Sequence, residues 1–84
     1  MQTTELTIRN ILHEQCGVST AAIRDGAHLI HDLDLDSLDV AELMSGLEKE
    51  LHISIPDSDW HTIQTVQELK TYVQHRINGM LAYA

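Results

Sequence analysis

Apolar side chains recur through the middle of this chain at the spacing of a helix that buries one face. The spaced residues are Val40, Leu43, Met44, Leu47 and Leu51. This i, i+3, i+4, i+7, i+11 pattern predicts an amphipathic helix over residues 37–51. Four acidic residues fall off the stripe, and we expect them to face water or a partner: Asp39, Glu42, Glu48 and Glu50.

Weaker patterns predict one helix before this segment and a short one after it. The first covers residues 4–15 and stops at Gly17, since glycine favours the ends of helices. Pro56 cannot continue a helix but can precede a new one. We therefore expect a short helix that is capped by Asp57 and reaches residue 60 or 63.

The last helix carries the clearest start signal in the chain. Thr65-x-x-Glu68 is a capping box ahead of an apolar pattern. The inward stripe of this helix is Leu69, Tyr72, Val73 and Ile77. Asn78-Gly79 predicts its end, so residues 80–84 are expected to form a loose tail.

Residues 17–36 lack a long helical pattern, although residues 19–23 suit a single turn. Apolar residues are expected to pin this loop across the helices: Val18, Ile23, Leu29, Ile30, Leu33 and Leu35. The patterns together predict an all-α fold, a small four-helix bundle with three longer helices, one short helix and a long structured first loop. We expect one domain over residues 1–84, with its core in about 3–77 and a tail at 78–84.

Composition narrows the possible partners. The 84 residues include 5 basic and 13 acidic side chains, for a formal net charge of −8. Phosphates would repel such a surface, so we expect no nucleic-acid partner and no anionic membrane, and a basic protein surface is the natural complement. No apolar run approaches membrane-spanning length, so stable membrane insertion is not expected. The single cysteine and the absence of signal-peptide features at the N-terminus predict a reducing, cytoplasmic location.

The start of the central helix presents one hydroxyl, that of Ser37, between two aspartates. Asp36 is the better N-cap candidate, because Asp39 then falls at the third helical position in an acidic variant of the capping box. Backbone N–H groups of a first helical turn lack partners inside the helix. A phosphate on Ser37 would therefore meet those donors at the positive end of the helix dipole.

This segment resembles the attachment site and second helix of an acyl carrier protein. The resemblance rests on Asp36-Ser37-Leu38-Asp39, followed by Glu42-Leu43 and Leu47-Glu48. Residues 53–57 and 65–69 are similar to the third-helix entry and fourth-helix start of that family, in order and at the right separations. Roughly residues 3–77 follow the family pattern.

The resemblance implies a carrier that is not itself an enzyme. Ser37 would take a 4′-phosphopantetheine arm from coenzyme A, through a phosphopantetheinyl transferase and its Mg²⁺, and the arm's thiol would hold acyl groups as thioesters. By the same resemblance the docking face for a ketosynthase and other acyl-processing enzymes with basic patches is Leu38, Asp39, Glu42 and Glu48. Four apolar residues either line a space for the acyl chain or simply pack the core: Leu47, Ile55, Ile63 and Leu69.

Several positions depart from the pattern of a housekeeping fatty-acid carrier. They are Asp34-Leu35, where Gly-Ala usually precedes the motif, and Val40, Ser45, Lys49, His52 and the aromatic Trp60. These departures suggest a specialised carrier of the polyketide or aryl-polyene type, while fatty-acid biosynthesis stays open. An aminoacyl carrier also stays open, although the Gly-Gly-x-Ser element common in peptidyl carriers is absent.

Other functions are weighed against the same residues. Asp32-x-Asp34-x-Asp36 opens like a calcium loop, but Ser37 stands where the turn glycine belongs and Leu43 where the bidentate glutamate is required. Six histidines show no ligand spacing, so we expect no metal site. A nucleophilic serine enzyme would need a base and an elbow motif that the sequence lacks. The alternative that remains is an acidic protein-interaction or divalent-cation-binding module without a prosthetic group.

Overall fold

A computed structural model describes residues 3 to 82 of the chain. Its four α-helices are α1 (Thr3–Glu14), α2 (Ser37–Leu51), α3 (Asp57–Trp60) and α4 (Val66–Ala82). One turn of 3-10 helix, η1 (Thr20–Ala22), lies in the long loop after α1. The predicted all-α bundle of three longer helices and one short helix is confirmed, and no strand is assigned within residues 3–82.

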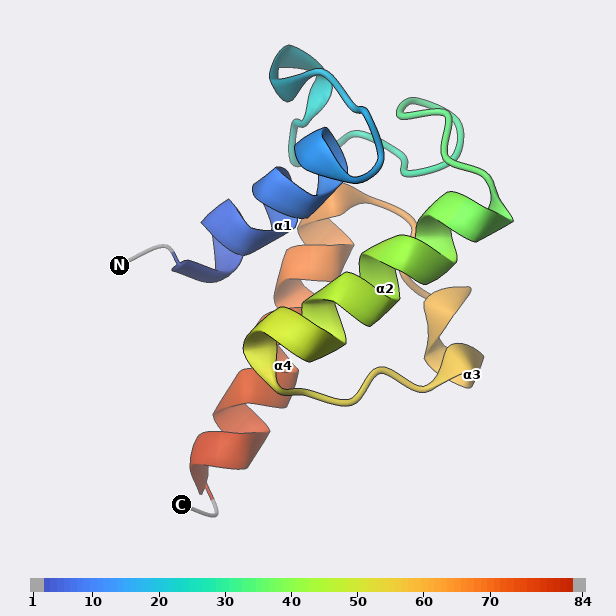
Figure 1. Ribbon diagram of the computed structural model, residues 1–84. Coiled ribbons are helices and arrows are strands. Elements are labelled where there is room, and N and C mark those ends of the chain that lie inside the picture. The colour runs from blue at the N-terminus through green and yellow to red at the C-terminus, as the bar shows by residue number, and fades with distance from the viewer. Residues whose placement is uncertain (1–2, 83–84) are drawn as a thin grey trace.

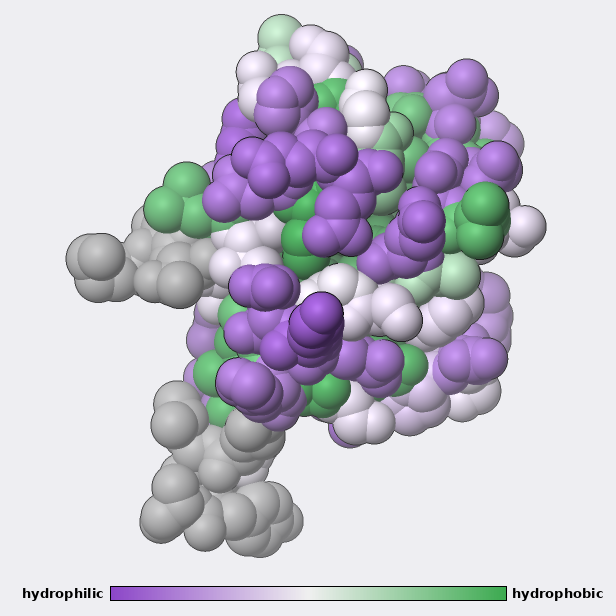
Figure 2. Space-filling model, viewed as in Figure 1, coloured by the Kyte–Doolittle hydropathy of each residue, from purple (hydrophilic) through white to green (hydrophobic). Residues whose placement is uncertain are grey.

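The three longer helices enclose the core. α1 packs against both α2 and α4, and Figure 1 shows α2 passing in front of α4 with α3 beside it. The largest fully buried side chains are Ile8, Leu12, Leu43, Met44, Leu47, Ile55, Leu69 and Val73. The α2 stripe thus buries its middle residues, while Val40 and Leu51 at its ends are half-buried. Hydrophilic side chains cover most of the face that Figure 2 shows.

The backbone conformation of Gly17 accounts for the end of α1, which stops at Glu14. Gly17 adopts a φ of 73°, which L side chains rarely adopt, and the Val18 N–H donates to the Leu12 carbonyl at 2.9 Å. This hydrogen bond across the glycine satisfies one of the last carbonyls of α1, and the helix has ended by Gly17, so the predicted stop is confirmed. The observed helix, Thr3–Glu14, lies one residue earlier than predicted at each end.

Two predictions about helix ends are wrong. α4 continues past Asn78 and Gly79 to Ala82, so residues 80–82 are helical rather than a tail, and residues 83–84 lie outside the described part. Gly79 does not take a positive φ, and Asn78 accepts an i, i+4 hydrogen bond from Gln74 at 3.1 Å, which belongs to a continuing helix. Asp57 is the first residue of α3 rather than its cap, because Pro56 occupies the N-cap and makes no side-chain bond there.

The long first loop is pinned partly as expected and partly by backbone contacts. Its predicted anchors are buried except Ile30, which is 53% exposed. Leu29 N–H donates to the Gln64 carbonyl at 2.8 Å, and Val66 N–H donates to the Ala27 carbonyl at 3.0 Å. The loop therefore lies against the α3–α4 connection, and Ile30 lines the same cavity as Ser37 and Val40 at the start of α2.

Candidate functional site

Ser37 stands at the first position of α2, directly after the cap. The Asp36 carboxylate accepts a hydrogen bond from Asp39 N–H at 2.8 Å, and Asp36 N–H donates to the Asp39 carboxylate at 3.3 Å. This reciprocal pair is the predicted acidic capping box. The capping box is made by Asp36 and Asp39, and Ser37 between them is exposed.

An apolar cavity of about 480 Å³ opens beside Ser37. Its walls come from the first loop, from α2, and from α3 with the segment that follows it. The lining residues are His28, Leu29, Ile30, His31, Ser37, Val40, Trp60, His61, Ile63 and Gln64. Its volume lies within the usual range for small-molecule sites, about 300–1,000 Å³. The one accessible serine of the family motif thus borders an apolar space.

Of the four residues considered for lining an acyl space, one lines the cavity and three lie in the core. Ile63 does line the cavity beside Ser37. Leu47, Ile55 and Leu69 are buried in the core, with exposed fractions of 0%, 2% and 0%. Plain packing, the other role considered for them, accounts for these three. The cavity uses Ile30 and Trp60 instead, which helical periodicity does not find because one lies in a loop and the other in a single-turn helix.

A tight turn forms the loop wall of the cavity. His28 Nδ1 accepts hydrogen bonds from the backbone N–H groups of Ile30 and His31, each at 3.2 Å. The imidazole rings of His28 and His31 lie 4.3 Å apart. Asp32 accepts from His28 N–H at 2.7 Å. These contacts hold the exposed Ile30 side chain at the rim of the cavity.

Two of the three aspartates that resemble a calcium loop are already bonded to the backbone. Asp32 closes the turn at His28, and Asp36 caps α2. Asp34 between them has a φ of 59°, in the left-handed region. Across residues 3–82 no group of three His, Cys, Asp or Glu side chains is arranged to hold a metal ion.

The expected docking residues have different surroundings. Leu38 is 66% exposed, and Glu42 is exposed on the same helix. Asp39 is half-buried in the capping box. Glu48 is also half-buried, and its carboxylate accepts a hydrogen bond from Ile55 N–H at 2.7 Å. Leu38 and Glu42 are therefore free for a partner, whereas Asp39 and Glu48 also hold the fold.

Replacing Glu48 with alanine is expected to lower the free energy of unfolding by about 1–3 kcal/mol, because the buried Ile55 N–H loses its acceptor. Urea denaturation measures this loss. Glu50→Ala is the matched control, since Glu50 is exposed on the same helix and its removal should change stability by less than about 0.5 kcal/mol. Equal stability of both variants would mean that Glu48 serves a partner and not the fold.

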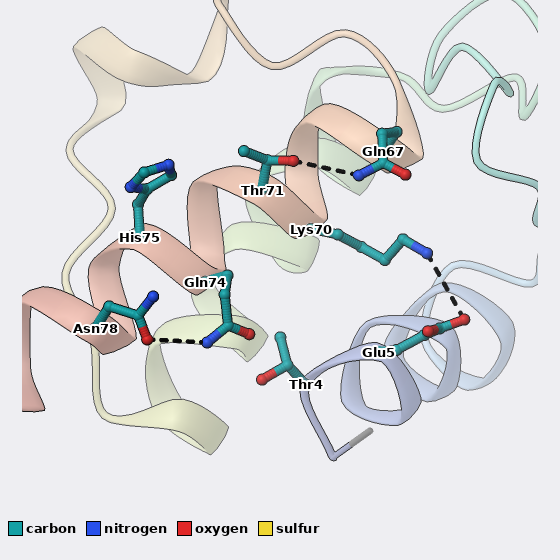
Figure 3. A pocket seen from close by; sticks show the side chains of 8 residues that line it. All are labelled: Thr4, Glu5, Gln67, Lys70, Thr71, Gln74, His75 and Asn78. Carbon is teal, nitrogen blue, oxygen red and sulfur yellow. Dashed lines mark hydrogen bonds and ion pairs between the residues drawn. The ribbon is translucent and has the colours of Figure 1, made fainter. Parts of the chain in front are cut away.

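A second, polar groove of about 340 Å³ lies between α1 and α4 and shares no residue with the cavity beside Ser37 (Figure 3). Lys70 pairs there with Glu5 at 3.6 Å and with Asp25 at 2.6 Å. Gln67 donates to Thr71, and Gln74 donates to Asn78, along α4. These polar groups satisfy one another, so the groove belongs to the solvated surface.

The fold and the exposed serine at the start of α2 define the class of protein, a small helical carrier domain. A family model described as "Phosphopantetheine attachment site" matches residues 7–73, which include Ser37. The chain is also 36% identical over 69 residues to an acyl carrier protein of Bdellovibrio bacteriovorus, covering 82% of this chain and 88% of that protein.

This chain belongs to the phosphopantetheine-binding family of acyl carrier proteins. The prosthetic group of that family is 4′-phosphopantetheine, held covalently, and its members are carriers rather than catalysts. Within the described residues no helix is long and apolar enough to cross a membrane.

Proposed function

We propose that Ser37 bears the 4′-phosphopantetheine arm and that this chain delivers acyl intermediates to enzymes of fatty-acid or of polyketide and aryl-polyene biosynthesis. The observation that carries the proposal is the position of Ser37, exposed at the first residue of α2 and bordering an apolar cavity. When bound, the arm supplies a thiol that holds acyl groups as thioesters.

The residues around Ser37 fit a phosphodiester at this hydroxyl. A helix N-terminus favours an attached phosphate through its dipole and its unpaired N–H groups. In a partner transferase with Mg²⁺, Ser37 Oγ attacks the β-phosphate of coenzyme A, and adenosine 3′,5′-bisphosphate leaves. A cytoplasmic location suits this supply of coenzyme A and the free thiol of Cys16.

The docking face is proposed to centre on Leu38 and Glu42, with Asp39 and Glu48 contributing charge. The formal net charge of −8 and the exposed acid of Glu42 steer the chain toward basic patches, and Leu38 adds an apolar contact. Partners of this kind are the transferase, a ketosynthase and other acyl-processing enzymes. Weak, fast docking suits a carrier that visits several enzymes, because the arm raises the effective concentration of its cargo at each.

Two of the departures from a housekeeping carrier support a specialised pathway. Val40 and Trp60 differ from the usual pattern, and both line the cavity beside Ser37. Substitutions that change the walls of this cavity change which acyl groups it accommodates. We therefore favour the polyketide or aryl-polyene type within the proposed function.

Intact mass tests the attachment. The chain is incubated with coenzyme A, Mg²⁺ and a broad-specificity phosphopantetheinyl transferase, and a gain of one phosphopantetheinyl group is expected. Ser37→Ala should gain nothing, whereas Ser45→Ala, which removes another exposed serine of α2, should gain the group like the parent. A folded parent that takes no group from several transferases would favour the acidic interaction module without a prosthetic group.

A further inference from the structure

The short helix α3 has little of its own to hold it in place. It is a single turn, Asp57–Trp60, with no buried residue and no side-chain bond at its N-cap. Isolated helices this short are not stable in water, so tertiary contacts must fix it. Its position matters because Trp60, with His61 and Ile63 just after it, forms one wall of the cavity beside Ser37.

One carboxylate of α3 is held by two side chains of α4. Asp59 Oδ2 accepts a hydrogen bond from the Tyr72 hydroxyl at 2.5 Å and an ion-paired bond from Arg76 Nη2 at 3.1 Å. Arg76 also donates to the Tyr72 oxygen from Nε at 3.0 Å and from Nη2 at 2.8 Å. Its guanidinium carbon lies 5.2 Å from the centre of the Tyr72 ring. We name Asp59, Tyr72 and Arg76 the α3 clamp.

The pKa shifts of Asp59 and Tyr72 both favour the hydrogen bond between them. The Tyr72 hydroxyl, and then Arg76, lower the pKa of the Asp59 carboxyl. Burial and the bond to Asp59 raise the pKa of Tyr72. At neutral pH Asp59 is therefore an acceptor only and Tyr72 keeps the proton that it donates. Charge-assisted bonds of this kind are stronger than neutral ones.

A second hydrogen bond, next to the α3 clamp, orients the Trp60 side chain in the wall of the cavity. Trp60 follows Asp59 directly, and its indole Nε1–H donates to the Ile55 carbonyl at 3.2 Å. Trp60 is half-buried and packs against the core. The backbone that carries this indole is therefore tied to α4 on one side and to the α2–α3 connection on the other.

We propose that Asp59, Tyr72 and Arg76 are positioning residues for cargo: they fix α3 so that Trp60 forms the wall on which an apolar acyl group rests. The inference depends on the proposed function, because the cargo arrives on an arm at Ser37. It predicts that loosening the clamp exposes Trp60 and the cargo together while the core of α1, α2 and α4 stays folded.

Tyr72→Phe tests the proposal with the smallest change, since the ring remains and only the bonding hydroxyl is lost. Trp60 is the sole tryptophan of the sequence, so fluorescence excited at wavelengths that tyrosine does not absorb reports on this wall. The transferase and octanoyl-coenzyme A load the arm in one step, and acrylamide quenching is read before and after loading. Because pockets of this size cover most of a small ligand, octanoyl loading should lower the quenching constant of the parent about twofold.

In Tyr72→Phe we expect stronger quenching of the unloaded chain and the loss of most of the protection by the octanoyl group, with an unchanged helical circular dichroism spectrum. Arg76→Gln provides a second route to the same result if the first variant folds poorly. Gln74→Ala is the matched control, because Gln74 is exposed on α4 and its side chain donates to Asn78 rather than to α3 within the described residues. Its loaded and unloaded quenching should match the parent.

The outcomes separate the two proposals. Equal protection of Trp60 in the parent and in both clamp variants, with the arm attached in all three, would overturn the positioning role alone. Absence of any mass gain at Ser37 would overturn the carrier proposal and the cargo role of the clamp with it. Protection of Trp60 that disappears in the clamp variants but not in Gln74→Ala would establish the inference.

Discussion

Leu43→Ala is expected to lower the free energy of unfolding by about 2–5 kcal/mol, a cost that combines lost apolar burial with the cavity left behind. Leu43 lies on the buried face of α2 and is 0% exposed. A small domain has only about 5–15 kcal/mol of stability in total. This single truncation should therefore remove a large share of it and shift the urea midpoint strongly.

Leu38→Ala is the matched control for this effect. The same substitution is made on the same helix, but Leu38 is 66% exposed. Its removal should change the free energy of unfolding by less than about 0.5 kcal/mol. Similar losses in both variants would mean that α2 does not turn its Leu43 face toward the core.

The helices that the sequence predicts well are those with two independent signals. α2 has an apolar stripe and a capping pair, Asp36 and Asp39, and both ends were predicted correctly. α4 begins at the predicted capping box, where Glu68 N–H donates to the Thr65 hydroxyl at 3.1 Å. Its end was missed because Asn78-Gly79 permits a stop but does not require one. The helix would end at this pair only if Gly79 took a positive φ, and in the structure it does not, so α4 continues to Ala82.

The site was predictable in its chemistry but not in its surroundings. Ser37 was found from a short motif, because a helix start and a hydroxyl between acids are local features. The cavity depends on backbone bonds between residues far apart in the chain, such as Leu29 N–H to the Gln64 carbonyl. No periodic pattern encodes such contacts, so the sequence predicts Ile30 only as an anchor of the loop, and Trp60 only as a departure from the housekeeping pattern.

Glu48 shows why a docking residue is hard to assign from sequence. A family pattern places it on the partner-binding face, and its acidic character suits that role. The structure gives the same carboxylate a backbone partner, Ile55 N–H, at 2.7 Å. A sequence does not distinguish an acidic residue that stabilises the fold from one that binds a partner. The hydrogen bond from Ile55 N–H to Glu48, which only the structure shows, makes that distinction here. Glu42 is therefore the cleaner probe of docking.

Glu42→Lys is expected to lower kcat/KM of the phosphopantetheinyl transferase for this chain by about tenfold or more at low ionic strength, since electrostatic steering changes association rates by about 10–10³. Glu42 is exposed on α2, the helix that begins with Ser37, so reversing its charge repels a basic patch that must approach this serine. Added salt should shrink the difference, because exposed charges are screened over about 10 Å at 0.1 M.

Glu14→Lys separates local docking from total charge. Glu14 is exposed at the end of α1, and its substitution changes the net charge by the same amount. Initial rates of phosphopantetheinylation at several salt concentrations measure both variants against the parent. If only Glu42→Lys slows the transfer, the transferase binds the face of α2 that carries Glu42. Equal slowing would mean that the enzyme responds to the overall acidic field, and an unaffected Glu42→Lys would remove Glu42 from the docking face.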